Sequence, residues 1–85
     1  MLTEYIEAAM RHATYEILED DKSYYGEIPE CPGVYANDVT LESCRNMLRE
    51  VLEGWIMLGI RHGATIPVID GIDVNEHADA ELWAN

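Results

Sequence analysis

A group of carboxylates lies in or beside the segments that the sequence predicts to be strands: Glu16, Glu19, Asp20, Asp21, Glu27, Glu30 and Asp38. Paired carboxylates can hold a metal ion or act as acid and base where burial separates their pKa values. The spacing of these residues reveals no such pair. We therefore expect solvated or partner-facing side chains, no catalytic residue, no enzyme activity, and no metal or cofactor.

The histidines and cysteines give no stronger signal. His12, His62 and His77 are far apart in the chain and lack metal-ligand spacing. Cys31 and Cys44 are the only cysteines and form no Cys-x-x-Cys pair, so we expect two reduced thiols, with Cys44 buried on a helix.

Length and charge limit the kinds of partner. A chain of 85 residues with 48% hydrophobic residues predicts one small folded domain. The formal net charge is −12, and the five basic residues are spread along the chain: Arg11, Lys22, Arg45, Arg49 and Arg61. We therefore expect no direct nucleic-acid binding, because phosphate recognition needs clustered Lys and Arg. A basic protein partner would instead be attracted by this surface.

No apolar run approaches the roughly 20 residues that cross a bilayer. The first residues, Met1 to Glu4, lack the basic start and apolar core of a signal peptide. These features predict no membrane contact and a cytoplasmic location.

The first half of the chain predicts a helix followed by a sheet. Residues 2–12 place apolar side chains three and four positions apart, and Thr3 is a candidate cap for this helix. Residues 13–19, 24–28 and 33–37 predict strands, and their short connections predict a three-stranded antiparallel meander.

The second half predicts a long helix over residues 41–62, capped by Thr40 and ended by Gly63. Its apolar residues recur at three- and four-residue spacing, so this helix should pack on one face of the sheet: Leu41, Cys44, Leu48, Val51, Leu52, Trp55 and Leu58. Gly54 and Gly59 inside the helix suggest close packing contacts. The predicted fold is α+β.

Beyond the long helix, residues 66–69 predict a short edge strand, since Pro67 cannot donate to a central ladder. Asp70 and Gly71 then predict a turn. Apolar residues beyond one helix stripe predict self-association into at least a dimer, with these contacts: Ile56, Met57, Ile60 and Trp83.

The order of these elements, with Glu27-Ile28-Pro29, Pro32-Gly33 and Thr40-Leu41-Glu42 in place, resembles the HicB-like family of bacterial antitoxins over about residues 15–74. The resemblance implies a single HicB-like domain over residues 1–85, with a partial ribonuclease H-like core at about 13–74 and an acidic tail at 75–85. It also implies no nuclease activity, and binding and neutralisation of a small basic HicA-type ribonuclease toxin. Many HicB-like antitoxins carry a DNA-binding domain, and we expect none here because no Lys or Arg follows Val74.

The predicted toxin-binding surface is the first hairpin and its acidic turn, which offer carboxylates beside aromatic anchors: Asp20, Asp21, Tyr24, Tyr25, Glu27 and Glu30. Period-two alternation places Tyr25 and Glu27 on one sheet face, and Gly26 and Ile28 on the face that the helix covers. The alternative is a solitary HicB-like oligomeric adaptor or regulatory module with no toxin partner.

Overall fold

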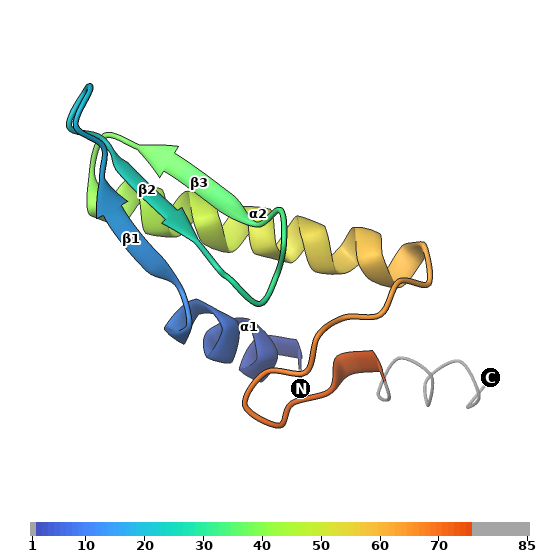
Figure 1. Cartoon of the computed structure of the whole chain (residues 1–85). Coiled ribbons are helices and arrows are strands. Elements are labelled where there is room, and N and C mark those ends of the chain that lie inside the picture. Colours follow the sequence, from blue (N-terminus) through green and yellow to red (C-terminus); the bar gives the residue numbers. More distant parts are fainter. Residues whose placement is uncertain (1, 76–85) are drawn as a thin grey trace.

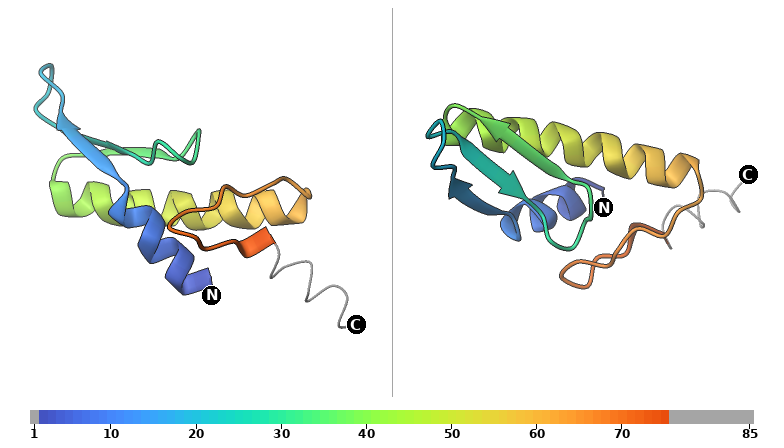
Figure 2. Two further views of the ribbon diagram at one scale, coloured as in Figure 1. Left: turned by 60° about the horizontal axis from the view of Figure 1, so that its bottom comes forward. Right: turned by 45° about the horizontal axis from the view of Figure 1, so that its top comes forward.

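The computed structural model describes residues 2–75 and confirms the predicted order of one helix, three strands and a long helix (Figure 1). The elements are α1 (Leu2–Arg11), β1 (Thr14–Ile17), β2 (Tyr24–Glu27), β3 (Tyr35–Asp38) and α2 (Leu41–Arg61). Helix α2 lies along one face of the sheet, and no described element covers the opposite face (Figure 2). The α+β class is therefore confirmed.

The three strands form an antiparallel sheet in the order β1-β2-β3. Each strand is shorter than its predicted segment. Strand β1 ends at Ile17 because residues 18–23 form a tight turn, in which the Lys22 amide donates to the Leu18 carbonyl at 3.0 Å. Lys22 adopts a positive φ of 59°, which bends the chain back into β2.

Helix α2 begins and ends within one residue of its prediction. The Ser43 amide donates to the Thr40 hydroxyl at 3.0 Å, which satisfies one of the free amides of the first turn. After the helix, Gly63 adopts the left-handed conformation with φ 71°.

A single stripe of α2 packs into the core, with one buried residue at every fourth position from 44 to 56: Cys44, Leu48, Leu52 and Ile56. Val51 and Trp55 lie half-buried beside this stripe. Leu41 and Leu58 were predicted to face the sheet and are exposed. Leu41 belongs to the first turn and Leu58 to the flank of the stripe, so neither is covered by another element.

Helix α1 contributes a large share of the hydrophobic core and packs against α2. Its buried residues are Tyr5, Ile6, Ala8, Ala9 and Met10. The cap assigned to Thr3 is wrong, because the helix already begins at Leu2. The Tyr5 hydroxyl donates to the Pro67 carbonyl at 2.6 Å and so fixes the segment that follows α2.

The edge strand predicted at residues 66–69 does not form. The Asn75 side chain accepts from the Ile66 amide and donates to the Ile66 carbonyl, so both backbone groups are satisfied without a strand partner. The Pro67 carbonyl is occupied by Tyr5. Only one bridge remains in this described region, between Ile69 and Ile72.

The turn predicted at Asp70 and Gly71 is confirmed. Both residues have positive φ, 51° and 78°, as a two-residue type I′ turn requires. The amide of Ile72 donates to the carbonyl of Ile69 at 2.8 Å across it.

One of the two helix glycines makes the predicted close contact. A β-carbon on Gly59 would lie 2.6 Å from Cδ1 of Ile66, so the small residue lets the returning chain approach α2. Gly54 has nothing within 4 Å of that position, and close packing does not explain it.

Candidate interaction surface

The uncovered face of the sheet is a patch that we call the outer face. Strand register defines its members, because paired residues share a side of the sheet: Thr14 pairs with Glu27, Glu16 with Tyr25, Tyr25 with Asn37, and Glu27 with Tyr35. The outer face therefore comprises Thr14, Glu16, Tyr25, Glu27, Tyr35 and Asn37. It contains two aromatic rings, two carboxylates and no basic residue.

Two tyrosines form the centre of the outer face. The rings of Tyr25 and Tyr35 stack with centroids 6.1 Å apart and an interplanar angle of 27°. The Tyr25 hydroxyl donates to Oε1 of Glu27 at 3.2 Å. Desolvation and the neighbouring Glu27 carboxylate raise the pKa of Tyr25, so the hydroxyl keeps its proton. The result is a flat aromatic surface with an acidic border.

The predicted alternation of β2 is confirmed. Tyr25 and Glu27 point outward, whereas Gly26 and Ile28 are buried on the α2 side. The close contact explains the glycine, because a β-carbon at residue 26 would lie 2.8 Å from the Tyr15 ring.

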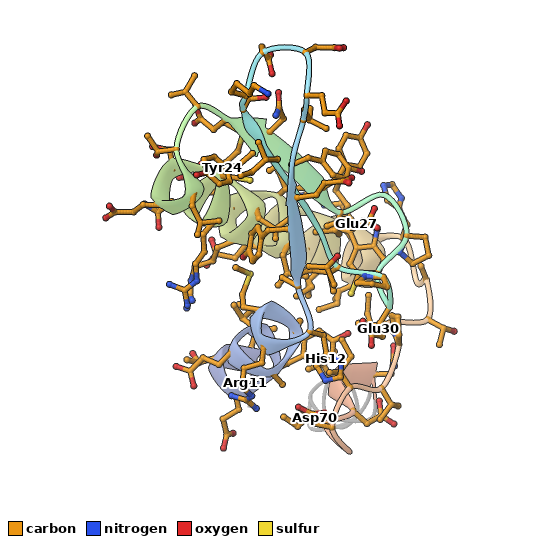
Figure 3. The ribbon with its side chains drawn as sticks, turned by 60° about the vertical axis from the view of Figure 1, so that its left-hand side comes forward. Arg11, His12, Tyr24, Glu27, Glu30 and Asp70 are labelled. Atoms are coloured by element: carbon orange, nitrogen blue, oxygen red, sulfur yellow. The ribbon has the colours of Figure 1, made fainter. Side chains whose placement is uncertain are left out.

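Four of the six predicted contact residues do not belong to the outer face, namely Asp20, Asp21, Tyr24 and Glu30. Tyr24 shares the α2 side of β2 and packs half-buried against the core. Glu30 lies in the loop between β2 and β3 and contacts His12, which directly follows α1 (Figure 3). Alternation along β2 already places Tyr24 with Gly26 and Ile28, so its assignment to the partner-facing surface was wrong at the level of the sequence. The position of Glu30 depends instead on contact with His12, which is distant in the chain.

The two aspartates at the tip of the β1–β2 turn differ in role. Asp20 is exposed. Asp21 accepts hydrogen bonds from the amide and hydroxyl of Ser23, at 3.0 and 2.6 Å. These bonds lower the pKa of Asp21. Asp21 is therefore part of the turn itself, whereas Asp20 points toward solvent.

Tyr35 is a member of the outer face that sequence reasoning missed. Its side chain is 57% exposed, although it belongs to a strand. The signal that could have found it is the pairing of strands, because β2–β3 register sets Tyr35 opposite Glu27.

A second group of charged residues joins three separate segments, and we call it the His12 clip (Figure 3). Nδ1 of His12 lies 2.7 Å from Oε2 of Glu30, and Nε2 lies 2.8 Å from Oδ1 of Asp70. Both partners are acceptors, so both ring nitrogens must donate, which only the imidazolium ion can do. Hydrogen bonds to Asp70 and Glu30 accordingly raise the pKa of His12, and His12 lowers the pKa of both carboxyl groups.

The structure buries one of the predicted oligomer contacts and exposes two others. Ile56 is only 1% exposed and is a core residue, so its assignment as surplus surface is wrong. Met57 and Ile60 are 67% and 43% exposed, next to the exposed Leu58. Trp83 lies outside the described residues.

Both cysteines are free and buried. Burial raises the pKa of each thiol. Within residues 2–75, no three His, Cys, Asp or Glu side chains are arranged to hold a metal ion. No helix in this part of the chain is long and apolar enough to span a membrane.

The small sheet backed by one long helix defines an α+β domain, and comparison with known proteins gives its class. Residues 4–67 match the model of the UPF0150-like family, so the chain belongs to this family, which is related to the HicB-like antitoxins. A search of curated proteins found no match.

A solved structure supports the same assignment. The crystal structure of TTHA0281 from Thermus thermophilus is similar, with 40% sequence identity and a TM-score of 0.80. The match covers 85% of this chain and 89% of that chain.

Proposed function

We propose that the protein is a HicB-like antitoxin that binds and neutralises a small basic HicA-type ribonuclease through its outer face. The observation that carries this proposal is an uncovered sheet face with stacked tyrosines bordered by carboxylates, on a chain of net charge −12. Aromatic side chains are frequent anchors of protein interfaces. The relation of the family to HicB-like antitoxins adds independent support.

The charges favour a basic protein over other partners. Glu16 and Glu27 can accept paired hydrogen bonds from arginine, and the remaining acidic surface attracts a cationic partner from a distance. The rings of Tyr25 and Tyr35 can stack with the same guanidinium groups. A basic toxin would thus be drawn in by long-range attraction and held by the aromatic centre.

The test is co-expression with the product of an adjacent reading frame that encodes a small basic protein. We expect the two to co-purify, and the complex to lose the ribonuclease activity of the partner. The double variant Tyr25→Ala and Glu27→Gln should abolish co-purification. The control Glu50→Gln removes an exposed charge from α2 and should leave it intact. Equal binding by both variants would place the contact elsewhere.

We further propose that the protein has no nuclease activity of its own. Within residues 2–75 the carboxylates are distributed over both helices, the strands and the loops, and no three of them are arranged to hold a metal ion. Labelled RNA incubated with the purified protein and magnesium or manganese should stay intact. Cleavage that is lost on replacing Glu27 or Asp38 would contradict this proposal and identify the protein as a nuclease.

A second candidate is a solitary oligomeric adaptor with no toxin partner. The exposed side chains of Met57, Leu58 and Ile60 on the last turns of α2 favour self-association. Sedimentation at tens of micromolar should show at least a dimer. A variant with Met57→Ser and Ile60→Ser should become monomeric, and a monomeric wild-type protein would contradict the self-association proposal.

A further inference from the structure

Three of the five basic residues are separated along the sequence but lie close together in space. A cavity of about 330 Å³ lies between α1 and α2, and three of the five basic residues line it. Its wall consists of Glu7, Met10, Arg11, Arg45 and Arg49. We call this cavity the arginine pocket. Its volume is at the lower end of the range for small-molecule sites, roughly 300–1,000 Å³.

Helix geometry brings these side chains together. Arg45 and Arg49 are four residues apart on α2, and Glu7 and Arg11 are four residues apart on α1, so each pair occupies one side of its helix. Like charges at this spacing repel each other, so Arg45 and Arg49 are unfavourable neighbours unless an anion lies between them. The buried Met10 links the two walls.

The carboxylates near the pocket compensate the arginines only weakly. Arg11 lies 3.5 Å from Asp70 and Arg49 lies 3.7 Å from Glu53. Both distances exceed the roughly 2.7–2.9 Å of a strong charged hydrogen bond. All four side chains are at least 39% exposed, so water screens both pairs. Glu7 supplies one negative charge on the wall itself.

The positive charge of Arg45 is compensated least among the three arginines of the pocket. No ion pair to it is formed within residues 2–75. Its charge acts on the nearby Tyr15 hydroxyl, where it opposes the burial that raises the pKa of Tyr15. That hydroxyl is buried, and Arg45 lies near enough to act on it, although no hydrogen bond of ordinary geometry joins the two.

We propose that the arginine pocket binds a small multivalent oxyanion of the phosphate class. Guanidinium groups present planar pairs of donors that match phosphate oxygens, and three of them approach one cavity. The ligand must be small, because a long polyanion such as RNA would extend over a surface of net charge −12 and be repelled. This site is separate from the outer face and does not depend on the proposed toxin binding.

The test is calorimetric titration of the full-length protein with inorganic pyrophosphate at constant ionic strength. We expect saturable binding that weakens about tenfold or more in the double variant Arg45→Gln and Arg49→Gln. The chain offers a matched control, since Lys22→Gln with Arg61→Gln removes the same charge away from the pocket. The control should bind pyrophosphate within about twofold of wild type.

Several outcomes would overturn the proposal. One is the absence of saturable binding at millimolar pyrophosphate, and another is equal loss of affinity in both double variants. A short single-stranded RNA that binds as tightly as pyrophosphate would identify a nucleic-acid surface instead. Circular dichroism of each variant checks that the fold is retained, and an amide chemical-shift titration of the wild-type protein locates the bound anion independently.

Discussion

The two faces of the sheet are made by the same three strands and serve opposite purposes. On the inner face, Tyr15, Gly26 and Ala36 pack toward α2. On the outer face, Tyr25 and Tyr35 stack beside carboxylates and meet solvent. Because side chains alternate along a strand, one short sequence supplies both surfaces. A change of one position along a strand therefore moves a substitution from the packed face to the face proposed to bind a partner.

The largest expected effect comes from the core beneath the inner face. Leu48→Ala should lower the free energy of unfolding by about 2–5 kcal/mol, because Leu48 is fully buried and its removal leaves a cavity. Leu58→Ala on the same helix is the control, and this exposed residue should cost less than about 0.5 kcal/mol. Urea unfolding measures both. If both variants lost similar free energy of unfolding, burial of Leu48 would not be a main source of stability.

Glycine substitutions sharpen the comparison further. Gly26→Ala should destabilise by about 1–3 kcal/mol, since its β-carbon would lie 2.8 Å from the Tyr15 ring and 3.3 Å from Cys44 Sγ. Gly54→Ala, in open space within α2, should instead stabilise by about 0.4–1 kcal/mol. Thermal unfolding of the two variants should therefore shift in opposite directions. A stabilising Gly26→Ala would argue against this packing.

A smaller effect on stability is expected at the outer face. Tyr35→Ser should cost about 0.5–1.5 kcal/mol, because it removes only the exposed stack with Tyr25. Tyr15→Ser, on the inner side of the sheet, should cost more, since that ring packs against the core. Urea unfolding decides the order. If the two losses were reversed, the assignment of the two faces would be wrong.

The smallest expected effect is a pH dependence from the His12 clip, which lies outside both faces. The pKa of His12 is raised in the folded protein. Its contribution to the free energy of unfolding is therefore complete below the ordinary pKa of 6.5 and is lost as pH rises through the raised pKa. The pKa values of Glu30 and Asp70 are lowered in the folded protein. Their contribution to the free energy of unfolding is therefore complete above about pH 4.5 and is lost as pH falls through the lowered pKa values.

The clip should therefore stabilise most between pH 4.5 and 6.5. Measured from about pH 3 to about pH 9, the free energy of unfolding should decline slightly on both sides of this window. His12→Asn should remove the decline on the alkaline side. The control His62→Asn changes an exposed residue outside the clip and should leave that decline in place. An unchanged alkaline decline in His12→Asn would contradict the assignment.

Much of the fold was accessible from the sequence. The ends of α2 were predictable because Thr40 and Gly63 each supply a local backbone requirement, a cap and a left-handed residue. The pairing of β2 with β1 and β3 was predictable because short connections join these strands, and the two sides of β2 followed from alternation. The edge strand at 66–69 was predicted wrongly, because the side chain that satisfies Ile66, Asn75, is nine residues away.

The candidate sites were less accessible because they depend on contacts between distant segments. Tyr25 and Glu27 were found because they alternate within one strand, whereas Tyr35 joins them only through strand pairing. Glu30 was assigned to the hairpin, but its partner His12 lies eighteen residues earlier. The arginines were judged to be scattered, although α1 and α2 bring three of them to one cavity.

The sequence by itself determined the net charge, which depends on composition alone. It also determined the local elements and the two sides of β2, because these depend on near neighbours along the chain. Only the tertiary structure decided that Tyr35 joins the outer face, that Ile56 is core, and that the arginine pocket exists. The physical reason is that burial and charge clustering arise when distant segments pack. Local spacing fixes the direction of a side chain, and packing fixes what it meets.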